Sequence, residues 1–198
     1  MKNLSLLTRK ILALCGALVL AFLDQLIKYL VVIFISPMNL PQVEVIPGVL
    51  SLTYVDNPGI AWSMFMDHPE LLTIATGVMM VALLVFLFTK FVRSGVLIVF
   101  LTLVLGGGLG NLADRVFRGS VVDYLHLEFV NFPIFNLADC LVVVGVILTL
   151  VWLLAYWFRD EKQNLPEHAA SSETGPSQKE GSKEKELVEK HSQEDLDD

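Results

Sequence analysis

Four long apolar stretches dominate the pattern of hydrophobic and polar positions along this chain of 198 residues. They cover residues 11–35, 71–89, 95 to about 111, and about 137–158. Each stretch approaches the roughly 20 residues that a helix needs to cross a bilayer, and each is far longer than an ordinary strand. The pattern therefore predicts an all-α polytopic membrane protein with four transmembrane helices.

The apolar pattern stops at the end of the fourth stretch. Residues 159–198 are rich in Glu, Lys, Ser and Gln, and they hold 12 acidic and 6 basic residues. Such a segment buries too little apolar surface to fold alone. We therefore predict a membrane domain over residues 1–158 and a disordered, acidic cytoplasmic tail over residues 159–198. Most of the net charge of −7 belongs to this tail, and we expect no nucleic-acid partner.

Basic residues flank the apolar stretches asymmetrically. Residues 36–70, between the first and second stretches, contain no Lys or Arg. By the positive-inside rule, both termini are predicted to lie in the cytoplasm and two larger loops outside. The basic residues that place the termini inside are Lys2, Arg9, Lys10, Lys90, Arg93, Arg159 and Lys162. Arg115 and Arg118 break the rule on the outer side, so they need another reason for their position.

The first outer loop contains a β-prone segment. Residues 49–55 alternate in part between apolar and polar side chains, and the sequence Asp-Asn-Pro-Gly at residues 56–59 is a strong turn signal. We expect a short strand or hairpin, a small β-like periplasmic element, at the outer membrane surface. Further along, Trp62 and Phe65 fit either a flap over a bound peptide or an anchor in the membrane interface.

The cysteines and histidines give little indication of metal or disulfide chemistry. Cys15 and Cys140 both lie inside apolar stretches, and the 4 His residues are scattered along the chain. No Cys-x-x-Cys pair is present in the sequence. We therefore expect no disulfide, no metal site and no cofactor.

Charged side chains inside membrane spans are costly, and they are usually functional or paired. In the first span, Asp24 and Lys28 are separated by about one helical turn. They form either a self-neutralising ion pair near the outer end of the span or a polar anchor that orients a neighbouring loop. Near the end of the third span, four glycines in residues 106–110 permit close helix packing in lipid.

The tetrapeptide Asn-Leu-Ala-Asp occurs twice, at residues 111–114 and 136–139. In the second copy, Asn136 and Asp139 have the spacing of a capping box, which alone would explain them. However, the third and fourth spans run antiparallel, so both copies meet at the outer face, with Asp123 between them in sequence. We therefore expect several carboxylates, two carboxamides and one Arg to converge at the edge of an apolar bundle.

These residues lie in four motifs that resemble bacterial lipoprotein signal peptidase (signal peptidase II), a four-span aspartyl peptidase of the inner membrane. The resemblance covers roughly residues 10–158, and all four motifs in this order are highly specific. As they stand in this sequence, the motifs are Asp24-Gln25-Leu26-Ile27-Lys28, Asn57-Pro58-Gly59-Ile60-Ala61-Trp62, Gly106 through Arg115 with Gly119 and Val121-Val122-Asp123, and Phe132-Pro133-Ile134-Phe135-Asn136-Leu137-Ala138-Asp139.

The resemblance implies a role for each polar residue. The catalytic pair that it implies is Asp123 and Asp139. The other residues that it implies are Asn57, Asn111, Arg115 and Asn136, which would line the substrate cleft, and Asp24, Lys28 and Asp114, which would support it. From the residues alone, Asp114 and Asp123 are rival partners for Asp139. We favour Asp123, because a cation beside a carboxylate lowers its basicity and Asp114 stands next to Arg115.

The family resemblance implies an intramembrane aspartic endopeptidase that uses no metal or cofactor. Its implied substrates are diacylglyceryl-modified prolipoproteins, from which it removes the signal peptide by cleaving just before the lipid-modified cysteine. It also implies a multi-pass protein of the bacterial inner (cytoplasmic) membrane, with the active site near the periplasmic face. We expect a monomer whose other contacts are with membrane lipid.

The residues leave two other classes of function open. A small carrier or channel would use the buried carboxylates to relay protons or cations, and it would have polar residues along the full depth of its spans. The second and fourth spans have essentially no ionisable residues in their middle. A non-catalytic assembly factor would use the glycines to pack against a partner helix, but it gives no reason for Asp123 to pair with Asp139.

Overall fold

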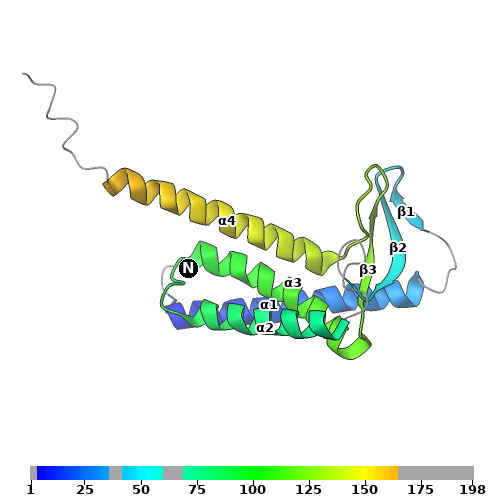
Figure 1. Ribbon diagram of the computed structural model, residues 1–198, viewed down its shortest axis with the longest axis horizontal. Coiled ribbons are helices and arrows are strands. Elements are labelled where there is room, and N and C mark those ends of the chain that lie inside the picture. The colour runs from blue at the N-terminus through cyan, green and yellow to red at the C-terminus, as the bar shows by residue number, and fades with distance from the viewer. Residues whose placement is uncertain (1–3, 36–41, 60–68, 165–198) are drawn as a thin grey trace, which may run out of the picture. The chain divides into compact units, whose positions relative to one another are not determined.

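The computed structural model describes residues 4–35, 42–59 and 69–164. Within these ranges, the chain forms four helices and three strands (Figure 1). In chain order they are α1 (Leu6–Phe34), β1 (Val43–Ile46), β2 (Leu50–Asn57), α2 (Pro69–Phe88), α3 (Gly95–Arg118), β3 (Val121–Leu127) and α4 (Leu137–Asn164). The chain divides into two compact units, Met1–Ala155 and Tyr156–Asp198, and the first contains all the residues discussed below as a site.

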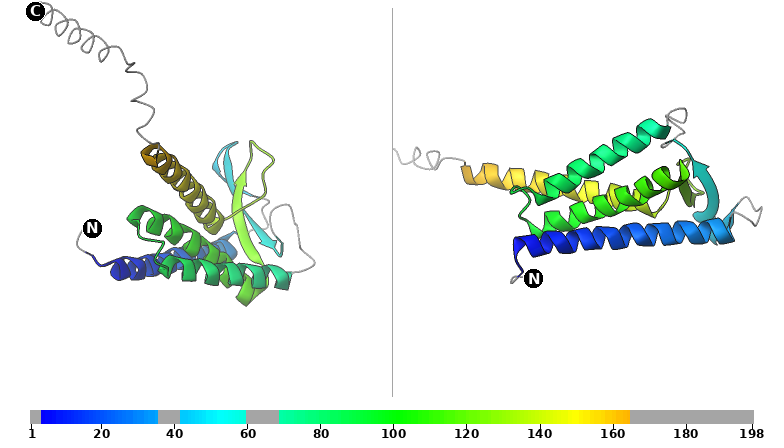
Figure 2. Two further views of the ribbon diagram at one scale, coloured as in Figure 1. Left: turned by 60° about the vertical axis from the view of Figure 1, so that its left-hand side comes forward. Right: turned by 90° about the horizontal axis from the view of Figure 1, so that it is seen from below.

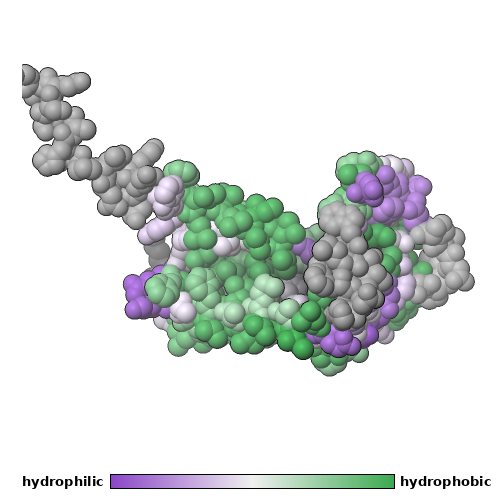
Figure 3. Space-filling view, viewed as in Figure 1, coloured by the Kyte–Doolittle hydropathy of each residue, from purple (hydrophilic) through white to green (hydrophobic). Residues whose placement is uncertain are grey.

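All four helices are long and apolar enough to span a membrane. Large hydrophobic side chains are exposed along them, among them Phe22, Val81, Val99 and Leu150. Figure 3 shows hydrophobic residues over the helices on the visible face, whereas hydrophilic residues lie on the sheet and at the opposite end of the helices. Apolar exposure of this extent is typical of helices that face lipid. The four predicted apolar spans are therefore confirmed as helices.

The third helix is longer than its apolar stretch. The stretch was expected to end at about Asn111, but α3 continues to Arg118 and ends at Gly119, whose φ of 79° gives a left-handed C-cap. The helix can continue because Asn111 and Asp114 are buried with hydrogen-bonding partners rather than exposed to lipid. This extension carries the polar residues to the end of the bundle where the sheet lies.

The glycine run allows α3 to lie in contact with the three other helices at once. A side chain at Gly106 would meet Leu20 of α1, and one at Gly107 would meet the start of α4. A side chain at Gly108 would meet Met80 of α2, and one at Gly110 would meet Asp24 of α1. The close packing expected from these glycines is therefore present, and each one serves a different contact.

A three-stranded antiparallel sheet, in the order β1-β2-β3, lies beside one end of the helices (Figures 1 and 2). The hairpin of β1 and β2 fits the expected β-prone element. However, β3 was not predicted, because its residues were read as a connection between two spans. In the register of β2 and β3, Asn57 lies opposite Val121 and Val55 lies opposite Asp123. The sheet thereby brings Asn57 next to Asp123.

Candidate active site

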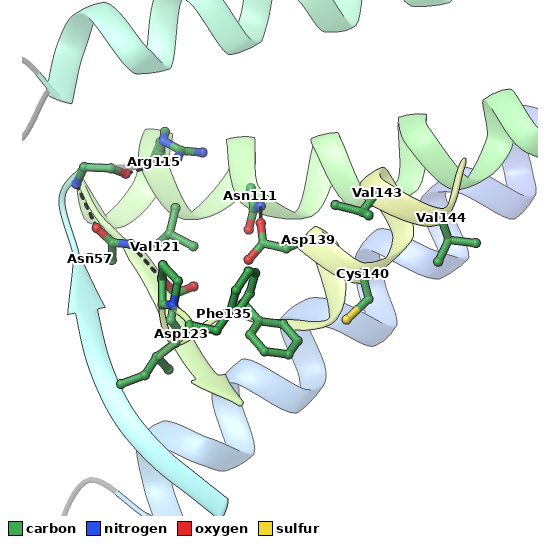
Figure 4. Close-up of a pocket in the computed structure, with 14 residues that line it drawn as sticks. Asn57, Asn111, Arg115, Val121, Asp123, Phe135, Asp139, Cys140, Val143 and Val144 are labelled. Atoms are coloured by element: carbon green, nitrogen blue, oxygen red, sulfur yellow. Dashed lines mark hydrogen bonds between the residues drawn. The ribbon is translucent and has the colours of Figure 1, made fainter. Parts of the chain in front are cut away.

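A pocket of about 530 Å³ lies where β3, α3 and the first turns of α4 meet (Figure 4). Its polar lining consists of Asn57, Asn111, Arg115, Asp123 and Asp139. The rest of its lining is Gly59, Val121, Phe132, Pro133, Ile134, Phe135, Cys140, Val143 and Val144. A largely apolar pocket with a few convergent polar groups is the usual form of a binding or catalytic site.

The carboxylate of Asp139 belongs to the first turn of α4. Its Oδ2 accepts a hydrogen bond from the backbone N–H of Asn136 (3.1 Å), and the Asn136 side-chain oxygen accepts one from the backbone N–H of Asp139 (3.0 Å). These two bonds form the capping box that the spacing predicted. The box leaves Oδ1 of Asp139 available to Asn111, whose Nδ2 donates to it at 2.7 Å. Capping and a place in the pocket therefore coexist in one residue.

Three elements hold the start of α4 in place. The first backbone N–H groups of a helix have no partner inside it. Here the N–H of Leu137 donates to the hydroxyl of Tyr124 on β3 (3.2 Å), and the N–H of Ala138 donates to Asp24 of α1 (3.0 Å). Asp139 is consequently tied to the sheet, to α1 and, through Asn111, to α3.

The second carboxylate of the pocket, Asp123, comes from β3 and is 4% exposed. Asn57 donates from Nδ2 to its Oδ2 (2.8 Å), and Asn136 donates from Nδ2 to its Oδ1 (2.6 Å). The same Nδ2 of Asn136 also donates to Oδ1 of Asn111 at 3.2 Å. Carboxamides from β2, α3 and the residue preceding α4 thus connect the two carboxylates.

The third carboxylate considered, Asp114, has a different environment. It is 1% exposed and forms an ion pair with Lys28 at 2.9 Å. It also accepts hydrogen bonds from the side chain of Gln25 (3.2 Å) and from the backbone N–H of Val122 (3.3 Å). The described residues that line the pocket include Asp123 but not Asp114. The geometry therefore favours Asp123 as the neighbour of Asp139 in the pocket.

The Asp24–Lys28 pair is part of a larger buried cluster. Lys28 lies 2.8 Å from Asp24 and 2.9 Å from Asp114, so two carboxylates share one ammonium group. The interpretation as a self-neutralising ion pair is therefore incomplete. Asp24 also accepts a hydrogen bond from the backbone N–H of Ala138, which fits the interpretation as a polar anchor. The segment that it anchors is the start of α4.

The guanidinium of Arg115 explains why a basic residue lies at this end of α3. It lines the pocket and donates from Nη2 to the backbone oxygen of Gly59 at 3.4 Å. It also interacts electrostatically with Asp139 and Asp123. A cation placed there compensates part of the negative charge of the pocket.

No group of three His, Cys, Asp or Glu side chains within residues 4–35, 42–59 and 69–164 is arranged to hold a metal ion. The polar lining consists instead of two carboxylates, two carboxamides and one guanidinium. Such a set can bind an extended peptide by hydrogen bonds and can transfer protons at its carboxylates.

The comparisons with known proteins agree with this geometry. The family model of signal peptidase (SPase) II matches residues 16–155. The chain belongs to the signal peptidase II family.

Members of this family resemble the chain over most of its length. It is 41% identical to a lipoprotein signal peptidase of Streptococcus pneumoniae over 140 residues, which covers 69% of this chain and 88% of that protein. It is 42% identical to a lipoprotein signal peptidase of Lactococcus lactis, with 74% of this chain and 95% of that protein covered. A solved bacterial membrane enzyme, determined by the in meso method, is similar with a TM-score of 0.67 and 31% identity over 78% of this chain and 92% of its own.

All nine polar residues implied by the resemblance to signal peptidase II lie in or next to the pocket. Sequence reasoning missed two further groups. Tyr124 accepts a hydrogen bond from the backbone N–H of Leu137 and so holds the start of α4. The only indication of this role in the sequence was the position of an aromatic residue next to Asp123. The apolar wall includes Val143 and Val144, whose signal was the helical spacing from Asp139 and Cys140 along α4. Trp62 and Phe65, which fit either a flap or an interfacial anchor, lie outside the described residues.

The stability of the signal peptidase II fold depends on pH through Asp123, because its carboxyl is buried. Burial raises the pKa of this carboxyl from an ordinary 3.8 to about 6. Hydrogen bonds from Asn57 and Asn136 lower the pKa, and the charge of Asp139 raises it. The folded chain therefore binds this proton more tightly than the unfolded chain. Its contribution to the free energy of unfolding is fully present below about pH 4 and is lost as the pH rises through about 6.

We expect the stability difference between the native chain and Asp123→Asn to depend on pH in that window. The native chain should lose up to about 3 kcal/mol relative to the variant between pH 4 and pH 6, with no further change above pH 7. Unfolding midpoints of both proteins in the same detergent at several pH values measure this difference. A difference that is constant from pH 4 to pH 7 would contradict the expectation.

Proposed function

We propose that this chain is an aspartic endopeptidase that removes signal peptides from prolipoproteins, with Asp123 and Asp139 as its catalytic pair. The observation that carries the proposal is the meeting of these two carboxylates in one pocket, where Asn136 donates hydrogen bonds to both. Membership of the signal peptidase II family supports the reaction class. The lipoprotein signal peptidases that resemble the chain support the substrate class.

The mechanism follows from two carboxyl groups that share one proton. Close carboxylates do not both ionise readily, so the pair retains one proton to a higher pH than an isolated carboxyl group does, and this titration belongs to both groups. The ionised carboxylate takes a proton from a water molecule, whose oxygen attacks the carbonyl carbon of the scissile peptide. The protonated carboxyl group donates a hydrogen bond to the carbonyl oxygen. Collapse of the tetrahedral intermediate breaks the C–N bond, and a carboxyl proton passes to the leaving amine.

The donors around the pair fit the charge that develops during this reaction. Asn57, Asn111 and Arg115 line the pocket, and Arg115 carries a full positive charge. A donor directed at the oxyanion of a tetrahedral intermediate contributes about 3–4 kcal/mol of transition-state stabilisation. We assign this role to Arg115 together with the carboxamides. Asp24, Lys28 and Asp114 act behind them as supports.

The apolar part of the pocket fits the proposed substrate, a prolipoprotein whose cysteine carries a diacylglyceryl group. Phe132, Phe135, Val143 and Val144 form a wall that accepts apolar side chains or acyl chains. The lipid holds the cysteine at the membrane surface, which is the depth expected for the end of the helical bundle. Cleavage just before the lipid-modified cysteine would then release the signal peptide within the bilayer.

The proposed place of the protein is the bacterial inner membrane. Basic residues before α1, between α2 and α3, and at the end of α4 support cytoplasmic termini, and they support a pocket near the periplasmic face.

The experiment that tests the function uses the full chain reconstituted in liposomes. We expect it to cleave a diacylglyceryl-modified prolipoprotein at the bond before the modified cysteine, as measured by mass spectrometry of both products. The same precursor without the lipid should react at least about tenfold more slowly, because remote binding energy assists the chemical step. Absence of cleavage, or cleavage after the cysteine, would refute the proposal. Proton or cation flux without cleavage would support a carrier instead.

A further inference from the structure

Three carboxamides direct their NH2 groups at the two carboxylates of the pocket. Each of these orientations depends on what holds the carboxamide oxygen. The oxygen of Asn57 accepts from the backbone N–H of Gly59 (3.0 Å), and that of Asn136 accepts from the backbone N–H of Asp139 (3.0 Å). In both bonds the donor is a backbone N–H group close in sequence. A substitution at the donor residue, Gly59 or Asp139, keeps this N–H unless the new residue is proline. The third carboxamide, Asn111, is held differently.

The oxygen of Asn111 is held by a side chain from another helix. Lys28 of α1 donates from Nζ to Oδ1 of Asn111 at 2.9 Å, and Asn111 then donates from Nδ2 to Oδ1 of Asp139 at 2.7 Å. An ammonium group is a donor without any acceptor capacity, so only the oxygen of the carboxamide can face it. Nδ2 of Asn136 also donates to this oxygen, but over a longer distance of 3.2 Å.

We propose that Lys28 is a positioning residue that fixes the orientation of the Asn111 carboxamide, and that it thereby keeps an N–H donor on Asp139. This inference rests on the proposed function, because it assumes that Asp139 is one of the catalytic carboxylates. Lys28 does not line the pocket among the described residues. It reaches Asp139 through Asn111, and its charge also acts on Asp123.

The cluster around Lys28 is built to hold its ammonium group in one place. The side chain is 1% exposed, and it is paired with Asp24 at 2.8 Å and with Asp114 at 2.9 Å. Its three N–H donors therefore have three acceptors, two carboxylates and the Asn111 oxygen. The third bond, to the Asn111 oxygen, connects this buried cluster to the pocket.

The hydrogen bond to Asp139 depends on this orientation. With its NH2 towards Asp139, Asn111 donates to the carboxylate oxygen at 2.7 Å. A reversed carboxamide would place its oxygen against the carboxylate oxygen and would remove this donor. The other charged or titratable groups that interact with Asp139 are Asp123 and Tyr124 on β3, Arg115 on α3, and Cys140 on α4.

The test compares two neutral replacements in a background that keeps the local charge. Removing Lys28 alone would leave Asp24 and Asp114 buried without a cation. We therefore combine each replacement with Asp114→Asn, whose side-chain oxygen still accepts from the N–H of Val122. Lys28→Met and Lys28→Gln have similar length and no charge, but only Gln retains an N–H donor for Asn111.

We expect kcat for the lipid-modified substrate to be at least about tenfold lower in the Met variant than in the Gln variant, with KM within about twofold. The Gln variant should match Asp114→Asn alone. Equal kcat in the Met and Gln variants would overturn the inference.

Two further variants separate positioning from folding. Lys10→Met removes another buried lysine of α1, which donates to the backbone oxygen of Thr89 at 2.7 Å far from the pocket. This variant should have a lower unfolding temperature but an unchanged kcat. If the Lys28→Met variant does not fold, Asn111→Asp decides, since it keeps a partner for Lys28 but has no NH2 for Asp139. Native kcat in Asn111→Asp would overturn the inference. Activity in Asp123→Asn or Asp139→Asn would refute the proposed function instead.

Discussion

Replacing either Asp123 or Asp139 by Asn is expected to lower kcat for a lipid-modified prolipoprotein by at least about a thousandfold. The reaction needs one carboxyl group that accepts a proton and another that donates one, and a carboxamide does neither. Both side chains line the pocket, and hydrogen bonds to carboxamides hold both. Single-turnover cleavage in liposomes, with the amount of folded protein determined separately, measures the loss.

Asp114→Asn is the matched control for these two variants. It is the same substitution, it lies at the same end of the bundle, and it removes a carboxylate that is buried, as Asp123 is. Its effect should pass through the ion pair with Lys28 and the hydrogen bond to Val122, so it should lower the unfolding temperature while cleavage remains measurable. A folded Asp114→Asn protein without activity, beside an active Asp123→Asn protein, would show that the catalytic pair is Asp114 and Asp139.

Much of the helical fold was predictable because lipid imposes a simple rule. A helix that crosses a bilayer needs a long run of apolar residues, and this run is visible in the sequence without any tertiary information. The prediction of where α3 ends was less accurate. Its last turns are polar, and they remain helical only because Lys28 and Asp139 provide partners from other elements.

The strand β3 could not be derived from local pattern. Its stability depends on pairing with β2, which lies more than sixty residues earlier in the chain, as in the pair of Asn57 and Val121. The choice between Asp114 and Asp123 depended on this strand. Successive side chains of a strand alternate, so Val122 and Asp123 lie on opposite faces of β3, and it is Asp123 that lines the pocket.

The repeated Asn-Leu-Ala-Asp sequence gave the right location for two different reasons. In the first copy, Asn111 enters the pocket and Asp114 enters the cluster around Lys28. In the second copy, Asn136 and Asp139 cap α4 and bond to the pocket residues at the same time. The sequence predicted where these residues meet, but it could not assign each side chain to one of the two sites.

The contact of α3 with α4 gives the second large expected effect, through Gly107→Ala. A Cβ atom at Gly107 would collide with the backbone oxygen of Ala138 and would lie 2.9 Å from Cγ2 of Val142 and 3.1 Å from Cβ of Leu141. Backbone atoms cannot rotate away, so the start of α4 must move. Overpacking of this kind costs about 1–3 kcal/mol of stability. The displacement also separates Asp139 from Asn111, and a shift of about 1 Å at a reacting group costs on the order of a hundredfold in rate.

Gly77→Ala is the control for this expectation, because the Cβ atom at Gly77 has its nearest neighbour, Cδ1 of Leu112, at 4.0 Å. In the interior of α2 an alanine favours the helix by up to about 1 kcal/mol, so this variant should be as stable as the native chain or more stable, with unchanged kcat. Unfolding midpoints and kcat for both variants distinguish a local collision from a general sensitivity to side chains in the bundle. Native kcat in Gly107→Ala would mean that α4 can shift along α3 without moving Asp139, and the geometry of the pocket would then not depend on this glycine.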